Sequence, residues 1–416
     1  MSEPTMGRAA DPGGPGGHTT PRRVMFGAGG TGGHVYPAIA VARTLMTIDS
    51  SIEPMFIGRA DRLEGRLVPE AGFTLHHVDA VPVPRRASLE VLRLPLALRR
   101  AVDRCSRLLS DTSSVAAVTF GGYVSFPLAR ASRRLGLPLV VHEQNALPGL
   151  ANRLAARWAD RVAVSFPGSA DHFPHPEHVA VTGNPVRVEI LALDDASARS
   201  RILRSFELDQ GRRTLLVFGG SQGARSLNQA AISSHGLWRR PERVQILHVA
   251  GRVLYGETAD AWAGVPRRAG GPLVRCVEFI DDMASAYAVA DVVVCRSGAT
   301  SIAEITALGK ASVLVPYPHA TGDHQRHNAL ALERAGGARV ILDADLDGRS
   351  LVAAAERLFD DDELRQTVAA AARAFGRRDA ADNVARLILG VLEAPDVPPI
   401  TPPLPSSPPP SLEDNL

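Results

Sequence analysis

The chain contains almost no lysine. Of its 46 basic residues only Lys310 is a lysine, and all the others are arginines. The phosphate-binding loop of P-loop nucleotidases needs a lysine directly after its glycines, and Lys310 follows no glycine-rich loop. The sequence therefore excludes that class. A pyridoxal enzyme needs a lysine for its Schiff base, so such an activity would depend on Lys310 alone.

Cysteines, long apolar runs and net charge are also scarce. The three cysteines, Cys105, Cys276 and Cys295, have neither a metal-binding spacing nor a disulfide pattern, which fits a reducing cytoplasm. No apolar run reaches the roughly 18 to 20 residues that cross a bilayer. The net charge of +2 does not indicate binding to nucleic acid.

Both ends of the sequence are typical of disordered segments. Residues 1–20 lack the apolar core of a signal peptide, and residues 394–416 are rich in proline. The length between them is too great for one ordinary core. We therefore expect two domains, residues 21–184 and residues 185–393, with the last helix of the second free to pack back on the first.

Short valine-rich runs alternate with longer helical patterns, which predicts doubly wound α/β sheets of parallel strands. The pattern begins twice, because RRVMFGAGGTGGH (22–34) and RTLLVFGGSQGAR (213–225) each indicate a strand, a glycine turn and a helix. We predict two Rossmann-like domains that face each other across a cleft. The predicted strands are 22–27, 54–58, 115–120, 138–142, 162–165, 178–182, 214–219, 244–250, 274–278, 291–295 and 312–316.

The stretch GAGGTGGH (27–34) has five glycines in seven positions before its histidine. Its first six residues match the dinucleotide pattern GxGxxG, which needs an acidic residue at the end of the second strand. Here that strand ends in Gly58-Arg59, and the nearest acid, Asp61, comes late. A nicotinamide or flavin enzyme therefore remains only as an alternative, and binding of another phosphate is favoured.

Further glycine-rich or polar motifs follow GAGGTGGH in a characteristic order. They are FGGYVSFP, HEQNALPG, TGNPVR, GGSQGAR, FIDDM and CRSGATSIAEI, which begin at residues 120, 142, 182, 219, 279 and 295. Each is only moderately specific, but the ordered set closely resembles the MurG family, the N-acetylglucosaminyltransferases of bacterial peptidoglycan synthesis. The resemblance extends from about residue 22 to about residue 390.

The resemblance implies a GT-B fold and transfer of N-acetylglucosamine from UDP-N-acetylglucosamine to lipid I, an undecaprenyl-diphosphate-linked muramoyl-pentapeptide, giving lipid II. It implies an inverting reaction without metal or other cofactor, on the cytoplasmic face of the cell membrane. The N-terminal domain would bind the acceptor, and the C-terminal domain the nucleotide sugar. Proteins of wall synthesis, and through them cell shape and division, are the implied biological context.

His34 stands at the first turn after the opening glycine loop. A neutral imidazole has an unperturbed pKa near 6.5, so at cytoplasmic pH it can accept the proton of an acceptor hydroxyl. The resemblance implies this role of catalytic base for displacement at the sugar C1. A histidine that only orients the loop fits the same pattern, and the sequence leaves both roles open.

Two diphosphates need backbone N–H donors, which glycine turns at helix N-termini supply. The HExxH zinc pattern fails because Ala146 stands where the second histidine belongs, so no metal site is predicted. A packed role behind the site suits His142 as well as a direct one. The residues that the resemblance assigns to the acceptor are Gly29, Gly30, Gly122, Tyr123, His142 and Glu143.

The resemblance assigns most contacts with the nucleotide sugar to the C-terminal domain and a few to residues of the N-terminal domain that face it across the cleft. Ser221 is expected to bind the UDP phosphate, Ile280 the uracil edge through its backbone, and Glu304 both ribose hydroxyls. Plainer roles remain open: a helix cap for Ser221, an exposed first-turn acid for Glu304, and a salt bridge for Arg187. The predicted donor-binding residues are Thr31, Gly32, Gly33, Asn145, Arg187, Ser221, Gln222, Ile280, Ala299, Thr300, Ser301, Glu304, His324 and Gln325.

PYPHATGDHQRHNAL (316–330) resembles the sugar-binding loop of the family. The family often has two glutamines here, whereas His324 precedes Gln325 in this chain, so which of them contacts the sugar stays open. Asp281 and Asp282 are adjacent and form no DxD metal motif. We expect them to cap the next helix.

One segment, residues 84–109, combines arginine with leucine. Between Arg85 and Arg107 seven arginines face only Glu90 and Asp103, a local charge of +5. Basic residues beside apolar ones suit an anionic membrane surface, and Pro95 predicts a short helix, a kink and a second helix. From the segment alone, a solvated helical face whose leucines pack on the N-terminal domain is favoured. Because the acceptor implied by the resemblance has a polyprenyl tail, we predict peripheral docking here. The leucines and arginines concerned are Leu89, Leu92, Leu94, Leu96, Leu98, Arg85, Arg86, Arg93, Arg99 and Arg100.

Two rival functions share the predicted fold. A hydrolysing UDP-N-acetylglucosamine epimerase needs carboxylates over the sugar, whereas the N-terminal half offers glycine loops suited to a second diphosphate. A catalytically silent adaptor would not need His34, Arg187, Ser221 and Glu304, all of which are present.

Overall fold

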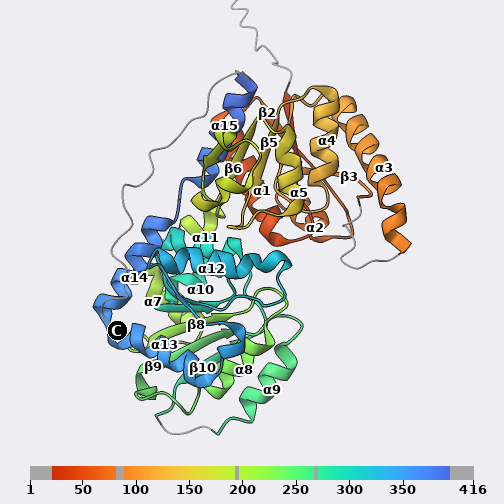
Figure 1. Cartoon of the computed structure of the whole chain (residues 1–416). Helices are drawn as coiled ribbons and strands as arrows, with labels where there is room; N and C mark the ends of the chain where they lie inside the picture. Colours follow the sequence, from red (N-terminus) through yellow and green to blue (C-terminus); the bar gives the residue numbers. More distant parts are fainter. Residues whose placement is uncertain (1–20, 81–88, 193–195, 267–269, 394–416) are drawn as a thin grey trace, which may run out of the picture.

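The computed structural model describes residues 21–80, 89–192, 196–266 and 270–393 of the chain. The ends predicted to be disordered, residues 1–20 and 394–416, lie outside these ranges. Two sheets with helices packed on them form two domains, one above the other in Figure 1. Within the described ranges, no helix has the length and apolar character needed to cross a membrane.

The N-terminal sheet consists of parallel strands in the order β3-β2-β1-β4-β5-β6-β7. Strand order reverses between β1 and β4, and ligands of such sheets bind beyond the carboxyl ends of the strands at that point. The strands are β1 (Arg22–Gly27), β2 (Ile52–Gly58), β3 (Thr74–His77), β4 (Ala116–Thr119), β5 (Leu139–Glu143), β6 (Arg161–Val164) and β7 (Val179–Val181).

The C-terminal sheet repeats this plan with the order β10-β9-β8-β11-β12-β13, again parallel. Its order reverses between β8 and β11. The turn GGSQG directly follows β8. The strands are β8 (Arg213–Phe218), β9 (Val244–Val249), β10 (Leu273–Val277), β11 (Val292–Cys295), β12 (Ala311–Leu314) and β13 (Arg339–Val340).

The helices follow the strands along the chain and pack on the sheets (Figure 1). They are α1 (Gly32–Ile48), α2 (Leu63–Glu70), α3 (Leu89–Asp111), α4 (Ser125–Leu135), α5 (Leu150–Ala155), α6 (Val188–Leu191), α7 (Ala196–Ser205), α8 (Arg225–Ser233), α9 (Tyr255–Ala263), α10 (Met283–Val289), α11 (Ala299–Leu308), α12 (His324–Arg334), α13 (Gly348–Asp360), α14 (Asp362–Phe375) and α15 (Ala380–Glu393).

The doubly wound α/β prediction is confirmed, and each predicted strand is present within two residues of its expected bounds. Two edge strands, β3 and β13, were not predicted. The side chains of β3 are partly or fully exposed and form no apolar run, and β13 has only two residues. Neither carries the continuous apolar signal by which buried parallel strands are recognised.

The predicted break at Pro95 is wrong. A single helix, α3, runs from Leu89 to Asp111 with Pro95 inside it. Pro95 lies in the second turn, so the helix loses only one hydrogen bond near its end. The helix packs against α4.

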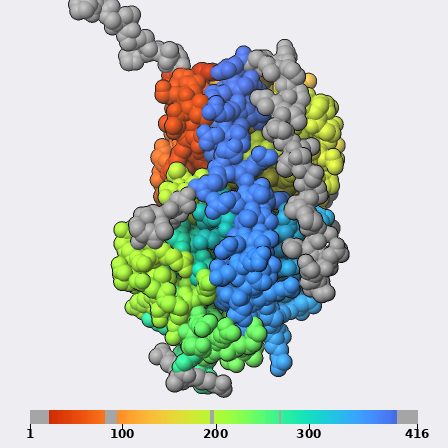
Figure 2. Space-filling view, turned by 90° about the vertical axis from the view of Figure 1, so that its left-hand side faces the viewer, coloured from red at the N-terminus to blue at the C-terminus, as the bar shows by residue number. Residues whose placement is uncertain are grey.

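The last helix, α15, leaves the C-terminal domain and packs on α1 of the N-terminal domain. Val384 and Ile388 are buried there in one apolar cluster with Val24 and Phe26 of β1. Figure 2 shows this final segment, in blue, running from the lower domain up the side of the upper one. The N-terminal core is therefore completed by the last helix that the structure describes.

Candidate functional site

The opening glycine loop connects β1 to α1. Gly30 has a φ of +92°, a conformation that favours glycine, and its N–H donates to Glu64 Oε2 (3.1 Å). A Cβ on Gly29 would lie 2.9 Å from the ring of Tyr123. The loop is therefore closely packed against Tyr123, which the sequence also assigned to the acceptor side.

Glu64 holds this loop in place, and the sequence analysis missed it. The side chain lies on α2, is fully buried, and accepts hydrogen bonds from the N–H groups of Gly30 and Arg59 and from the Tyr123 hydroxyl. Its only sequence signal was an acid in the first turn of a short helix, which usually indicates a surface position favoured by the helix dipole. Because Glu64 is buried next to the loop and accepts these hydrogen bonds, it fixes the conformation of the loop.

His34 lies in the first turn of α1, against the glycine turn after β4. Its Nδ1 lies 3.0 Å from Gly29 O and 3.2 Å from Thr31 Oγ1. A carbonyl only accepts, so Nδ1 carries the proton and Nε2 keeps a free lone pair. Nε2 has no hydrogen-bond partner among the residues that the structure describes. It faces Gly121, on which a Cβ would lie 2.9 Å away.

Burial lowers the pKa of His34 from its usual value, and this effect outweighs the Gly29 carbonyl and the charge of Glu143, which both act to raise it. The ring is therefore neutral at pH 7. A neutral imidazole with a free Nε2 lone pair has the protonation state that a general base needs.

The direct acceptor contact predicted for His142 is wrong. Its ring is fully buried, donates from Nε2 to Gly183 O (3.1 Å) and accepts at Nδ1 from Gln144 (3.0 Å). It packs on Phe120, with ring centroids 5.1 Å apart, and burial lowers its pKa to about 4. No part of this side chain reaches the cleft, so His142 supports the strand ends from behind.

Glu143 is likewise not free for an acceptor. Its carboxylate is buried and accepts from the backbone N–H groups of Asn145 (2.9 Å) and Gly149 (3.1 Å) and from the Asn145 and Asn152 amides. Both oxygens are used to shape the loop that follows β5. The predicted contact is therefore replaced by a structural role for this carboxylate.

The turn after β8 is exposed at the face of the C-terminal sheet. Ser221 and Gln222 are both exposed, and α8 begins only at Arg225, with Ala224 as its N-cap. Ser221 is thus not a helix cap, and its hydroxyl has no hydrogen-bond partner within the described ranges. Both side chains are available to a ligand, as predicted for a phosphate.

Glu304 is buried, which excludes the exposed first-turn acid as an explanation. It accepts from Arg187 (2.9 Å) and from the hydroxyl of Tyr287 (3.0 Å). Arg187 also stacks on Tyr36 of α1, with the guanidinium 4.8 Å from the ring centroid. The salt bridge foreseen for Arg187 is therefore present, and through Tyr36 it joins the two domains.

The first turn of α11 faces the opening loop across the cleft. A Cβ on Gly33 would lie 3.8 Å from Thr300 Oγ1, and this buried hydroxyl has no hydrogen-bond partner in the described part of the chain. Ala299 is buried, and Ser301 is partly exposed. The structure thus brings Gly33 close to the start of α11, which is predicted to bind the donor.

The remaining predicted donor residues lie in the first turn of α12 and just beyond β10. Gln325 is half-buried and its Oε1 accepts from Tyr317 N–H (3.0 Å), while His324 Nδ1 lies 2.6 Å from Thr321 O. Ile280 lies just beyond β10 with its side chain buried. The capping role expected for the aspartates is confirmed for Asp282, which accepts from Ser285 N–H at the start of α10.

The position of Lys310 bears on the pyridoxal alternative. Lys310 lies at the amino end of β12, opposite the cleft, and its Nζ donates to Ala290 O (3.0 Å). Burial lowers the pKa of this amine to about 8. It is thus not placed for pyridoxal chemistry at the cleft. Among the described residues, no group of three His, Cys, Asp or Glu side chains could hold a metal ion.

Residues 24–164 match the N-terminal domain of glycosyltransferase family 28, and residues 214–384 match its C-terminal domain. A UDP-N-acetylglucosamine–N-acetylmuramyl-(pentapeptide) pyrophosphoryl-undecaprenol N-acetylglucosamine transferase of a Nocardioides strain is 43% identical over 367 residues, covering 88% of this chain and 97% of that protein. The transferase of the same name from Halothermothrix orenii is 38% identical, covering 88% and 98%.

Solved structures agree with these sequence matches. The crystal structure of MurG from Acinetobacter baumannii has a TM-score of 0.71 and 30% identity, and the match covers 89% of this chain and 99% of that one. An S. aureus MnaA–UDP structure, with a TM-score of 0.65, is only 13% identical over 91% of this chain and 99% of that one. The second likeness therefore shows the fold alone.

The loop-organising role of Glu64 leads to a stability prediction. Glu64→Ala leaves three partly buried donors without their acceptor, so we expect the free energy of unfolding to fall by about 3 kcal/mol. Glu64→Gln keeps one acceptor oxygen and should lose less. Urea denaturation measures both variants.

The matched control is Glu70→Ala. Glu70 lies on the same helix and makes only an exposed pair with Arg66, so its removal should cost less than about 0.5 kcal/mol. Equal stability of the two alanine variants would contradict the role of Glu64.

Proposed function

We propose the following reaction for this chain, which belongs to the family of UDP-N-acetylglucosamine–N-acetylmuramyl-(pentapeptide) pyrophosphoryl-undecaprenol N-acetylglucosamine transferases. It transfers N-acetylglucosamine from UDP-N-acetylglucosamine to lipid I, which gives lipid II for peptidoglycan synthesis and so supports cell shape and division. The observation that carries the site assignment is the meeting of the glycine-rich start of α1 with the start of α11, at Gly33 and Thr300, beside His34.

The two domains divide the substrates between them. The loop Gly29–Gly30 with Gly122 and Tyr123 binds the acceptor diphosphate, while Ser221, Gln222 and the start of α11 bind the phosphates of UDP. Apart from the Gly30 N–H, which donates to Glu64, each set offers backbone N–H groups and the positive end of a helix dipole to an anion. Glu304 receives the ribose hydroxyls, because its carboxylate has acceptor capacity beyond the bonds from Arg187 and Tyr287.

His34 acts as the general base in an inverting displacement. Its Nε2 takes the proton of the acceptor hydroxyl as that oxygen forms a bond to C1 of the sugar. The bond from C1 to the phosphate oxygen breaks on the opposite face, and its electron pair leaves with UDP. The helix starts and glycine N–H groups stabilise the departing diphosphate, so no cation is required for this step.

The epimerase alternative requires carboxylates over the sugar. The two buried carboxylates nearest the glycine loops, Glu64 and Glu143, are instead hydrogen-bonded to backbone and side-chain donors. This arrangement favours the transferase.

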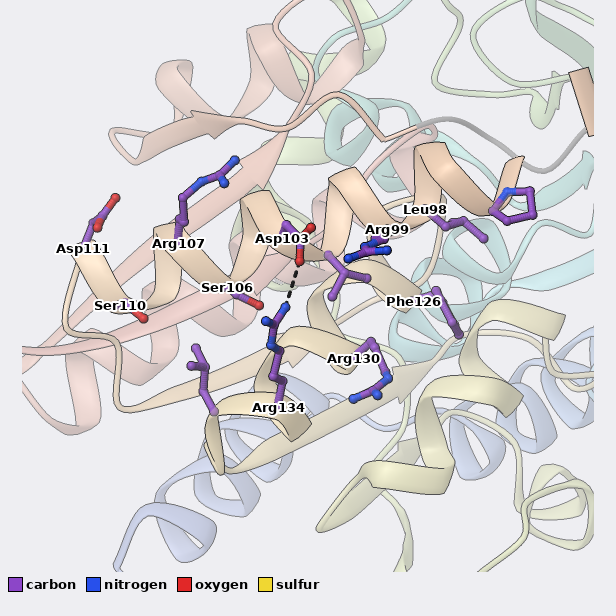
Figure 3. Close-up of a pocket in the computed structure, with 13 residues that line it drawn as sticks. Leu98, Arg99, Asp103, Ser106, Arg107, Ser110, Asp111, Phe126, Arg130 and Arg134 are labelled. Carbon is purple, nitrogen blue, oxygen red and sulfur yellow. Dashed lines mark hydrogen bonds and ion pairs between the residues drawn. The ribbon is translucent and has the colours of Figure 1, made fainter. Parts of the chain in front are cut away.

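A groove between α3 and α4 is the surface that we assign to the membrane. It has a volume of about 940 Å³, and Figure 3 shows Arg99 and Leu98 of α3 and Phe126 and Arg130 of α4 along it. Arg134 and Asp103 form an ion pair across the two helices (2.8 Å). Guanidinium groups beside apolar side chains suit anionic headgroups above a lipid surface.

Docking through this groove places the enzyme peripherally on the cytoplasmic face, where its polyprenyl-linked acceptor is anchored. Leu96, on the same helix, is 54% exposed and adds an apolar contact. Arg85 and Arg86 lie outside the described residues, as do the side chains of Leu89, Leu92 and Arg93. Proteins of the wall-synthesis machinery remain expected partners.

The first test of the reaction uses labelled UDP-N-acetylglucosamine in the presence of EDTA. We expect label to pass to a lipid I analogue, and no change of the nucleotide sugar when the acceptor is omitted. Chromatography of the lipid and nucleotide fractions measures both. Formation of an epimer without acceptor would favour the rival enzyme, and activity that only magnesium or manganese restores would overturn the metal-independent step.

The base assignment predicts a pH dependence. Because burial lowers the pKa of His34, the neutral ring persists through pH 7, and kcat should fall only as the pH drops below the ordinary histidine value of about 6.5. His34→Ala should reduce kcat by roughly 10²- to 10⁴-fold while the Kd of UDP-N-acetylglucosamine stays nearly unchanged. A near-normal kcat in this variant would remove the assignment.

The docking surface is tested with vesicles. Wild-type protein should sediment with anionic vesicles more than with neutral ones and be released by salt. At about 1 kcal/mol per basic residue, replacing Arg99 and Arg130 by glutamine should weaken binding about 30-fold. The matched control replaces the exposed Arg201 and Arg204 of α7. Equal binding of both double variants would place the docking surface elsewhere.

A further inference from the structure

Asn328 joins the two domains beside the predicted sugar site. It lies on α12 of the C-terminal domain, and its side chain is fully buried. Its Oδ1 accepts from Ala146 N–H (2.7 Å), and its Nδ2 donates to Asn145 Oδ1 (3.0 Å) and to Ser297 O (3.3 Å). Two of these partners belong to the N-terminal loop after β5.

Backbone groups fix which end of the Asn328 amide faces which partner. Ala146 N–H can only donate and Ser297 O can only accept, so the oxygen must face the first and the nitrogen the second. The nitrogen therefore also faces Asn145, which must present its own oxygen. The orientation of Asn145 is in this way set from the opposite domain.

Glu143 completes the constraint on Asn145. Its carboxylate only accepts, and it lies 3.1 Å from Asn145 Nδ2, which agrees with the orientation that Asn328 imposes. An amide nitrogen carries two hydrogens, and Glu143 takes one. The other hydrogen of Asn145 Nδ2 remains for a ligand, and it can recognise only an accepting oxygen.

The segments predicted to bind the donor converge on Asn328. Gln325 lies one helical turn before it, and the Ser297 hydroxyl donates to Gln325 O (2.8 Å). Ser297 directly precedes Gly298 and the first turn of α11. The buried Asn328 amide thus links the loop of Asn145 to the residues before α11 and to α12, which carry predicted donor-binding residues.

We propose that Asn328 is a positioning residue: it fixes the Asn145 amide so that its nitrogen donates to an oxygen of the sugar, and it couples this contact to the apposition of the two domains. The inference rests on the proposed function, since it assumes a nucleotide sugar in the cleft. Asn328 itself touches neither UDP nor sugar, so its loss should affect the sugar and spare the nucleotide.

The test compares binding of UDP-N-acetylglucosamine with binding of UDP by calorimetry. Asn328→Ala removes all three hydrogen bonds. Asn328→Asp keeps the acceptor for Ala146 N–H but cannot donate to Asn145. In both variants we expect the Kd of UDP-N-acetylglucosamine to rise about fivefold or more, as for the loss of one hydrogen bond, while the Kd of UDP changes less than twofold.

The matched control is Gln245→Ala. Gln245 is another fully buried amide with several hydrogen bonds, but it lies at the amino end of β9, away from the cleft. It should lower the melting temperature and leave the ratio of the two Kd values unchanged.

Three outcomes overturn the proposal: wild-type affinity for the sugar nucleotide in Asn328→Asp, an equal loss for UDP and UDP-N-acetylglucosamine in both Asn328 variants, or the same ratio change in Gln245→Ala. Failure of the proposed function is detected separately. In that case the wild-type protein would not transfer labelled sugar to the lipid I analogue.

Discussion

Direct contact between glycine turns is the constraint on which both halves of the site depend. A Cβ on Gly122 would lie 2.2 Å from Gly29 O, and one on Gly223 would lie 2.1 Å from Ala250 O. Both glycines have positive φ, a conformation that other residues rarely adopt. Because the turns touch without side chains, the helix starts behind them stay open towards an anion. The position of the His34 ring and the exposure of Ser221 follow from this packing.

The fold was largely predictable because buried parallel strands are apolar along their whole length. The site was predictable in part, since the glycine turns and His34 follow strand ends that the pattern located correctly. The direction of a side chain was not predictable. His142 and Glu143 stand at the end of β5, yet both side chains are buried in protein and do not reach the cleft. Glu64 and Asn328 were missed because their importance comes from partners distant in the sequence.

Two polar connections between the domains lie beside the proposed donor site. At one, Arg187 binds Glu304 and stacks on Tyr36, and at the other, Asn328 binds the loop of Asn145. The first lies where the ribose is proposed to bind, and the second lies where the N-acetylglucosamine is proposed to bind. The first uses charge, and its paired groups are partly or fully buried, where a lone charge would be costly. At the second place, the neutral Asn328 amide orients the Asn145 side chain without burying a charge.

The return of α15 to the N-terminal domain has a consequence for synthesis on the ribosome. Val384 and Ile388 belong to the same apolar cluster as Val24 and Phe26, so the first domain to emerge is the last to complete its core. The C-terminal domain lies between these two parts of the chain and can fold while the first sheet still exposes the surface of α1. Until α15 has emerged from the ribosome, that surface is open to chaperones and to aggregation.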